Sequence, residues 1–385
     1  MSRAHAALLC LAFFFTACSS GSDDDDGPVI EDAGGGIGGL ESCVQETPAQ
    51  TLLCGSAFAT DGVTPLVGAE IRASASNAPT SATGMTLRGV LNSNRCLTDA
   101  TGSYVCVLLV PESGTASFEI VAEGFEERIF EVDVVVSGVN AVEPTILSTD
   151  SSIRWAVLTG EYDGVQVLLA QLKGCTLNGT DGLPFNGENP ELARGSEDCE
   201  SKGLSVIEPT EADTFMDGGL NQYDALFVNC ETDLGDDDDI NAAVRSFSES
   251  GKYLYFSDRS DPWLSAVFPD TINFAGNLTD FNGSAVGRVV NPGLASVVGD
   301  DIELIFDLDK WTAIDSVISD TTTYIEADIS EYTNYAGTKP ITVGFKPGDS
   351  AGCVFYTSYH IEGASTGSDQ ELAMKYLIQN IESVC

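Results

Sequence analysis

The hydrophobic pattern of the chain divides it into two parts. Between about Gly55 and Leu147, short runs alternate apolar with polar residues, and Gly, Pro, Asn and Asp separate the runs. A period of two residues is that of a half-buried strand, and short strands between frequent turns are typical of an antiparallel sandwich. The runs that predict strands are GSAFA, GAEIRASA, GSYVCVLLV, ASFEIVAEGF and RIFEVDVVV. We therefore predict a β-sandwich over residues 51–149.

After residue 152 the pattern changes to strands that alternate with helices. Compact apolar runs predict strands at Trp155–Leu158, LSVIEP, YDALFVN, KYLYF and CVFYTSY, and apolar residues at helical spacing follow several of them. Ser368 and Glu371 have capping-box spacing at the start of a last helix. This alternation predicts an α/β domain over residues 152–385 with a mainly parallel, doubly wound, flavodoxin-like sheet. Residues 270–340 are richer in strand-like runs, and we predict an insertion there that covers one edge.

The N-terminus has the features of an export signal. Arg3 and His5 precede the run ALLCLAFFF, which is too short to span a bilayer, so residues 1–17 are predicted to be a cleaved signal peptide. The residues FTAC resemble the bacterial lipobox, which implies that Cys18 receives lipid and becomes the new N-terminus. Residues 18–50 are acidic and rich in Gly, and they predict a disordered tether.

The resemblance to a lipoprotein signal implies a location and a partner. The protein would be exported and attached to the membrane of the cell envelope through its N-terminal lipid. Ser19 rather than Asp follows the lipidated cysteine, which in the best-studied bacterial sorting system favours the outer membrane. No second apolar run of spanning length occurs in the sequence, so the lipid would be the anchor.

The charge of the chain excludes one class of partner. Asp and Glu number 59 against 17 Lys and Arg, and the formal net charge is −42. Such a field repels the phosphates of nucleic acid, so we predict no nucleic-acid partner. The charge bears on solubility and does not indicate a reaction.

The cysteines predict disulfides. Nine follow Cys18, and they are scattered without C-x-x-C pairs, while only one histidine remains after the signal, so we predict no metal site and no cofactor. In an oxidising compartment such cysteines form disulfides, and an odd number leaves at least one thiol unpaired. We predict that Cys175 pairs with Cys199, and the other pairings stay open. The nine are Cys43, Cys54, Cys96, Cys106, Cys175, Cys199, Cys230, Cys353 and Cys385.

Motifs in the first domain resemble the carboxypeptidase regulatory-like domain, a transthyretin-type sandwich. They are DG at 61–62, PLVGA at 65–69, TDATGSY at 98–104 and AEGF at 122–125, and they occur in the family's order. The polar stretch Ser74–Asn94 departs from the pattern. The resemblance implies a spacer or stabilising module, and related sandwiches sometimes bind carbohydrate.

Polar residues follow four predicted strands of the second domain. In an open α/β sheet, ligands bind at the carboxyl ends of the strands, so these residues define a candidate cleft. Its members are Glu161, Tyr162, Asp163, Cys230, Ser257, Asp258, Arg259, His360 and Glu362. The acidic run Asp236–Asp239 could hold calcium, but a charged helix N-terminus is the better interpretation.

The order of elements and the ending GCVFYTSYHIE resemble the class I glutamine amidotransferase-like superfamily, in its trehalose-utilisation-type branch. The resemblance implies that His360 and Glu362 match the His and Glu of a catalytic triad. The nucleophile elbow would fall at Ser257-Asp258-Arg259, which has neither the expected Cys nor a flanking Gly.

These observations predict a binding or scaffolding protein rather than an enzyme. The ligand would be a sugar, a peptide or another envelope protein. One alternative is an envelope hydrolase that uses a non-standard residue set around His360 and Glu362, for example Ser257 as nucleophile or Asp258 and Glu161 as an acid/base pair. Another alternative is a purely structural surface protein.

Overall fold

The computed structural model describes most of the chain beyond the N-terminal region, and the described residues belong to one compact unit, Ile37–Cys385. The predicted signal peptide, Cys18 and most of the predicted tether lie outside the described residues. The described residues are 43–385 except 61, 63, 74–95, 111, 187–188, 209–218, 233, 235, 278–282, 307–309, 319, 331–336, 362–367 and 382–384.

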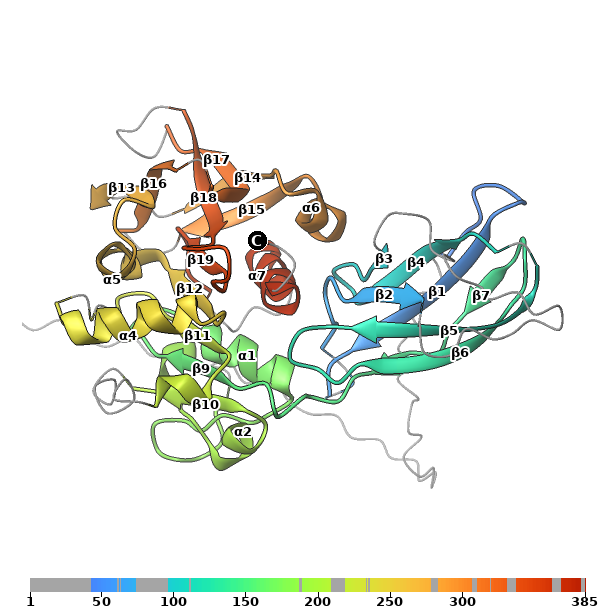
Figure 1. The fold of residues 1–385 in the computed structure, drawn as a ribbon, viewed down its shortest axis with the longest axis horizontal. Helices are drawn as coiled ribbons and strands as arrows, with labels where there is room; N and C mark the ends of the chain where they lie inside the picture. The colour runs from blue at the N-terminus through green and yellow to red at the C-terminus, as the bar shows by residue number, and fades with distance from the viewer. Residues whose placement is uncertain are drawn as a thin grey trace, which may run out of the picture. The chain divides into compact units, whose positions relative to one another are not determined.

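Two four-stranded sheets form from the alternating runs of the first half (Figure 1). One sheet has the order β4-β1-β7, with β8 paired to β1, and the other has the order β3-β2-β5-β6. Residues of both sheets, such as Leu53 and Phe118, belong to one buried cluster, so the two sheets share a core. The strands are β1 (Thr51–Phe58), β2 (Glu70–Ala73), β3 (Cys96–Leu97), β4 (Ser103–Leu108), β5 (Gly114–Val121), β6 (Arg128–Val134), β7 (Val139–Ala141) and β8 (Thr145–Ile146).

A nine-stranded sheet organises the second half, with the order β10-β9-β11-β12-β19-β18-β17-β14-β15. The five strands from β10 to β19 pair in parallel, and the remaining four pair antiparallel. The sheet consists of β9 (Trp155–Leu158), β10 (Leu204–Ile207), β11 (Ala225–Val228), β12 (Tyr253–Ser257), β14 (Gly283–Val289), β15 (Asp301–Phe306), β17 (Thr322–Asp328), β18 (Thr338–Phe345) and β19 (Val354–Thr357).

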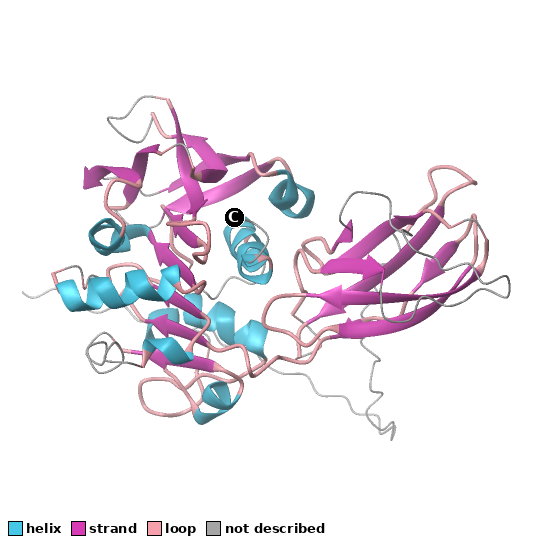
Figure 2. Ribbon diagram, viewed as in Figure 1, coloured by secondary structure: helices cyan, strands magenta, loops and turns pink. Residues whose placement is uncertain are grey.

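Helices cover both faces of the parallel part of this sheet (Figure 2). In β9, Trp155 and Val157 belong to the core cluster that holds α1 (Val165–Lys173) and α7 (Asp369–Gln379). Ala156 and Leu158 belong to the cluster that holds α4 (Asp238–Glu249) and α5 (Asp261–Val267). Both faces are therefore buried, which explains why these strands are continuous apolar runs. The shorter helices are α2 (Glu197–Ser201), α6 (Pro292–Val298), η1 (Pro190–Leu192), η3 (Leu220–Gln222) and η4 (Asp258–Ser260).

The segment 270–340 has a different role from the one that the sequence predicts. It does not simply cover an edge, because β14, β15, β17 and β18 extend the main sheet. The sheet is consequently mixed rather than mainly parallel. A separate two-stranded ribbon of β13 (Ile272–Asn277) and β16 (Thr312–Val317) contacts β18 and η4. Alternating runs identify strands, but their spacing does not reveal which neighbour each strand selects, and short connections favour antiparallel pairs here.

Disulfides account for eight of the nine cysteines after Cys18, so the prediction of disulfides with one thiol left over is confirmed. Cys175 pairs with Cys199, as the sequence predicts, and the free cysteine is Cys230. Cys96–Cys106 joins β3 of one sheet to β4 of the other. The remaining pairs are Cys43–Cys54 and Cys353–Cys385.

Two predicted helix starts are confirmed by capping contacts. The Asp237 side chain accepts hydrogen bonds from the N–H groups of Asp239 and Ile240, so the acidic run begins α4. The Ser368 hydroxyl accepts from the N–H of Glu371 at the start of α7. None of the described helices is both long enough and apolar enough to cross a bilayer.

Candidate functional site

Three strand ends bring a cysteine, an aspartate and a histidine together at one edge of the nine-stranded sheet. Cys230 follows β11, Asp258 follows β12 and His360 follows β19, and these three strands are neighbours in level register. The Cys230 Sγ lies 3.5 Å from Asp258 Oδ2, and His360 Nδ1 lies 3.9 Å from the same oxygen. Candidate donor atoms of the three side chains all lie within 4.8 Å of one another. We call these residues the Cys-Asp-His cluster.

Asp163 fixes the backbone of this cluster from the loop after β9. Its carboxylate is buried and accepts hydrogen bonds from the N–H groups of Cys230, at 3.4 Å, and Ile361, at 3.0 Å. The Ser257 hydroxyl donates to the same carboxylate. One side chain therefore holds the segments that follow β11, β12 and β19.

Asp258 occupies the turn between β12 and the helical segment that follows it. Its φ is 38°, a left-handed conformation that non-glycine residues rarely adopt. The Asp258 Oδ1 accepts from the N–H of Thr312 at 2.8 Å, and its backbone carbonyl accepts from the Tyr356 hydroxyl at 2.7 Å. These bonds hold the strained turn in place without glycine. The expectation that a missing glycine prevents a sharp turn here is therefore wrong, and Asp258 stands where an elbow presents its nucleophile.

The electrostatics of the cluster disfavour a thiolate. Burial raises the pKa of Cys230 far above its usual value, and the nearby carboxylates of Asp258 and Asp163 raise it further. Burial also raises the pKa of Asp258 and of Asp163, and the charge of His360 opposes both shifts. Neighbouring Asp261, whose Oδ1 accepts from the Thr312 hydroxyl, has its pKa raised by burial to about 6. A thiol in these surroundings is a poor nucleophile.

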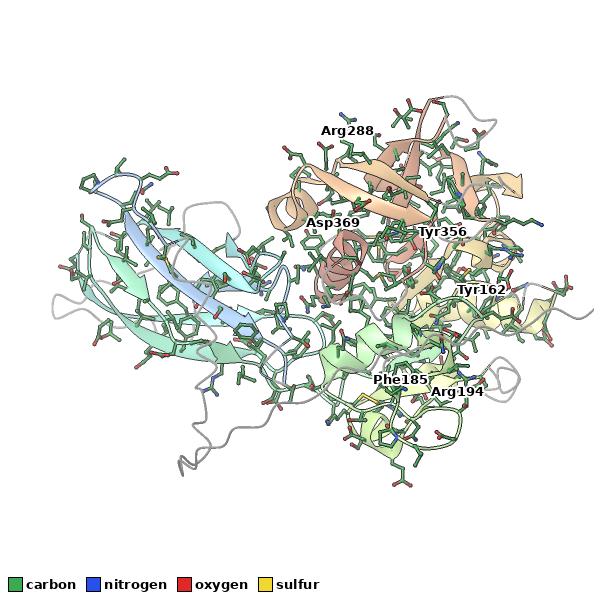
Figure 3. The ribbon with its side chains drawn as sticks, turned by 180° about the vertical axis from the view of Figure 1, so that it is seen from behind. Tyr162, Phe185, Arg194, Arg288, Tyr356 and Asp369 are labelled. Carbon is green, nitrogen blue, oxygen red and sulfur yellow. A yellow bond between two sulfur atoms is a disulfide. The ribbon has the colours of Figure 1, made fainter. Side chains whose placement is uncertain are left out.

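The other predicted members of the cleft are distributed around the cluster. Glu161 and Tyr162 are exposed, and Tyr162 and Tyr356 are labelled in Figure 3. Arg259 forms an ion pair with Glu231. Ser257 is fully buried with its hydroxyl bonded to Asp163, so that proton is already committed to a carboxylate. Glu362 lies outside the described residues.

Two residues of the site were not predicted. Thr312 belongs to β16 and Tyr356 lies within β19, and both contact Asp258. The segment that carries Thr312 contains no local motif, since its role depends on a contact across 54 residues of sequence. Tyr356 is inside an apolar strand, where an aromatic residue is ordinarily a core residue.

A separate cavity lies at the opposite end of the sheet. It has a volume of about 480 Å³ and is lined at the carboxyl end of β18, an end that pairs with the start of β19. Its lining includes Asp320, Lys346, Asp349 and Cys385. None of the candidate cleft residues lines this cavity.

Comparison with known proteins gives remote structural similarity and no sequence match. No family model matches the chain, and no curated protein matches it. A ThuA-like protein from Bacteroides uniformis is similar with a TM-score of 0.40 and 11% identity, over 59% of this chain and 89% of that one. A GMP synthase protein from Thermoplasma acidophilum has a TM-score of 0.33 and 9% identity, over 58% and 94%. An α-L-fucosidase from Paenibacillus thiaminolyticus has a TM-score of 0.35 and 14% identity, over 60% and 33%. Matches at this level do not assign the chain to a family.

Proposed function

We propose that this protein is a lipid-anchored component of the cell envelope, whose α/β domain is a non-catalytic binding or scaffolding domain. The domain would be a member of the class I glutamine amidotransferase-like superfamily, carried on a carboxypeptidase regulatory-like spacer. The ligand would be a carbohydrate, a peptide or another envelope protein. The exposed Glu161 and Tyr162 beside the cluster would contribute to the binding surface.

One observation carries the non-catalytic assignment. The free thiol of Cys230 is fully buried and lies 3.5 Å from an aspartate oxygen. A cysteine nucleophile needs a lowered pKa, supplied by a positive charge or a helix N-terminus. Here the two carboxylates nearest the thiol act in the opposite direction and raise its pKa. The residue that could replace the missing nucleophile is therefore held in its inactive, protonated form.

The strand order supports the proposed superfamily. Numbered along the chain, the five parallel strands have the order 2-1-3-4-5, which is the flavodoxin-like order. The Cys-Asp-His cluster lies at the carboxyl ends of three of these strands, where such sheets bind ligands. The two four-stranded sheets of residues 51–146 are compatible with the proposed spacer.

Thiol alkylation tests the non-catalytic assignment. In chelator-treated native protein at pH 8, we expect iodoacetamide to leave Cys230 unmodified, and to modify it fully in denaturant. If labelling requires an opening that costs about 4 kcal/mol, it should be about 1,000-fold slower than for an exposed thiol. Ser350→Cys supplies that exposed reference on the same chain. Fast labelling of native Cys230 would identify an activated thiolate and favour a cysteine hydrolase.

A hydrolase is the second candidate, because one observation favours it. Asp258 has the positive φ of a nucleophile elbow and lies beside His360. An aspartate nucleophile would have to be ionised and reachable, whereas Asp258 is fully buried and its pKa is raised by that burial. Hydrolysis of an ester panel that is lost in Asp258→Asn would establish this candidate and exclude the first.

The lipid anchor is tested at Cys18. We expect Cys18→Ser to release the protein from the membrane fraction, because several acyl chains at about 0.8 kcal/mol per buried methylene would be lost together. Cell fractionation followed by immunoblotting measures the change. Ser19→Ala is the matched control and should leave the protein in the membrane fraction. Membrane association that survives Cys18→Ser would exclude this mode of attachment.

A further inference from the structure

The Cys-Asp-His cluster has the composition and spacing of a metal site. We propose that Cys230, Asp258 and His360 together bind one divalent cation of the zinc or cobalt type. Zinc lies about 2.0–2.3 Å from thiolate, imidazole and carboxylate ligands, so tetrahedral donor atoms are separated by about 3.3–3.6 Å. The observed separations from Asp258 Oδ2 are 3.5 Å to Cys230 Sγ and 3.9 Å to His360 Nδ1. Shifts of about 1 Å or less per side chain would complete the geometry.

The single carboxylate is arranged to offer one oxygen to the cation. Its Oδ1 accepts a hydrogen bond from the N–H of Thr312 at 2.8 Å. Its Oδ2 faces both the Cys230 sulfur and the His360 ring nitrogen. The strained φ of 38° at Asp258 fixes this orientation, and backbone strain of this kind is concentrated at functional sites.

Asp163 supplies the outer support that metal ligands usually have. Its carboxylate accepts from the N–H of Cys230 and from that of Ile361, the residue after His360. Groups that hold ligands in place from outside the first layer commonly affect metal affinity by about 10–100-fold. Two of the three ligands are thus positioned by one buried side chain from the loop after β9.

The choice of cation follows from donor chemistry and charge. Thiolate and imidazole select zinc-like ions, whereas calcium and magnesium prefer oxygen ligands throughout. With a thiolate, a carboxylate and a neutral imidazole, a divalent cation gives a neutral group inside a buried site, which lowers the cost of burying these charges. Three protein ligands leave a fourth tetrahedral position for water or for an oxygen of a bound molecule. His360 keeps 7% exposure, so the cluster reaches the surface at its ring.

Cobalt spectroscopy tests the site on the purified full chain after chelator treatment. We expect one equivalent of Co²⁺ to produce a thiolate-to-cobalt charge-transfer band in the near ultraviolet, and one equivalent of Zn²⁺ to displace it. Cys230→Ser should abolish the band. Asp258→Asn and His360→Gln should lower zinc affinity by about tenfold or more, measured by competition with a chromogenic chelator.

Matched controls separate this site from other acidic groups. Glu161→Gln and Asp236→Asn change exposed carboxylates and should leave the band and the affinity unchanged. Zn²⁺ should raise the Tm of the native chain but not that of Cys230→Ser, and circular dichroism reports whether each variant folds. If Cys230→Ser does not fold, His360→Gln decides through the changed energy of the cobalt band. The proposal is overturned if the native chain gives no band, if the band persists in Cys230→Ser, or if the ligand variants keep native affinity.

Discussion

Replacing Asp163 with alanine should lower the free energy of unfolding by roughly 3 kcal/mol, since leaving a buried donor unsatisfied costs about 1–3 kcal/mol each. The N–H groups of Cys230 and Ile361 both lose their acceptor. The Ser257 hydroxyl loses less, because it also lies 3.4 Å from the carbonyl oxygen of Val228. Burial raises the pKa of Asp163, so part of the loss is offset by removing a carboxylate that is costly to ionise. Urea denaturation at pH 7 measures the difference.

Two variants control for this result. Glu161→Ala removes an exposed carboxylate two residues away and should change stability by no more than about 0.5 kcal/mol. Asp163→Asn keeps one carbonyl oxygen but turns the other acceptor into a donor, so we expect an intermediate loss. Equal stability of Asp163→Ala and the native chain would show that Asp163 does not hold the three strand ends together.

Replacing Gly160 with alanine should cost about 3 kcal/mol and should also disturb the Cys-Asp-His cluster. A Cβ at this position would lie 1.9 Å from the carbonyl oxygen of Cys230, which real structures do not tolerate. Neighbouring backbone cannot simply yield, because the Asn229 N–H donates to Leu158 at 3.1 Å and the Thr232 hydroxyl donates to Thr159 at 3.0 Å. The segment that carries Cys230 would have to move away from β9.

Denaturation and thiol labelling together measure this prediction. The Gly160→Ala protein should lose stability and should show faster alkylation of Cys230 than the native chain. Gly348→Ala is the matched control, since a Cβ there meets no atom within 4 Å, and it should stay within about 0.5 kcal/mol of the native value. Native stability and native labelling in Gly160→Ala would mean that the ends of β9 and β11 are not in contact.

The candidate residues differed in how far the sequence could place them. Polar residues after buried strands identified Asp163, Cys230, Asp258 and His360 as neighbours, because parallel strands end at the same edge of a sheet. The same reasoning also included Glu161 and Tyr162, which the structure leaves exposed. Sequence position alone does not tell which of two adjacent loop residues is buried.

The sequence alone determined the local elements. Apolar runs marked β9, β11, β12 and β19, an acidic run marked the start of α4, and an odd number of cysteines required a free thiol. Those features depend on residues within a few positions of one another, where propensity, capping and periodicity act. Tertiary structure decided that Cys230 is the free thiol, that β14, β15, β17 and β18 join the main sheet, and that Thr312 holds Asp258 in a left-handed turn. These depend on contacts between distant segments, and their strength comes from burial and hydrogen bonding that exist only after the sheet has assembled.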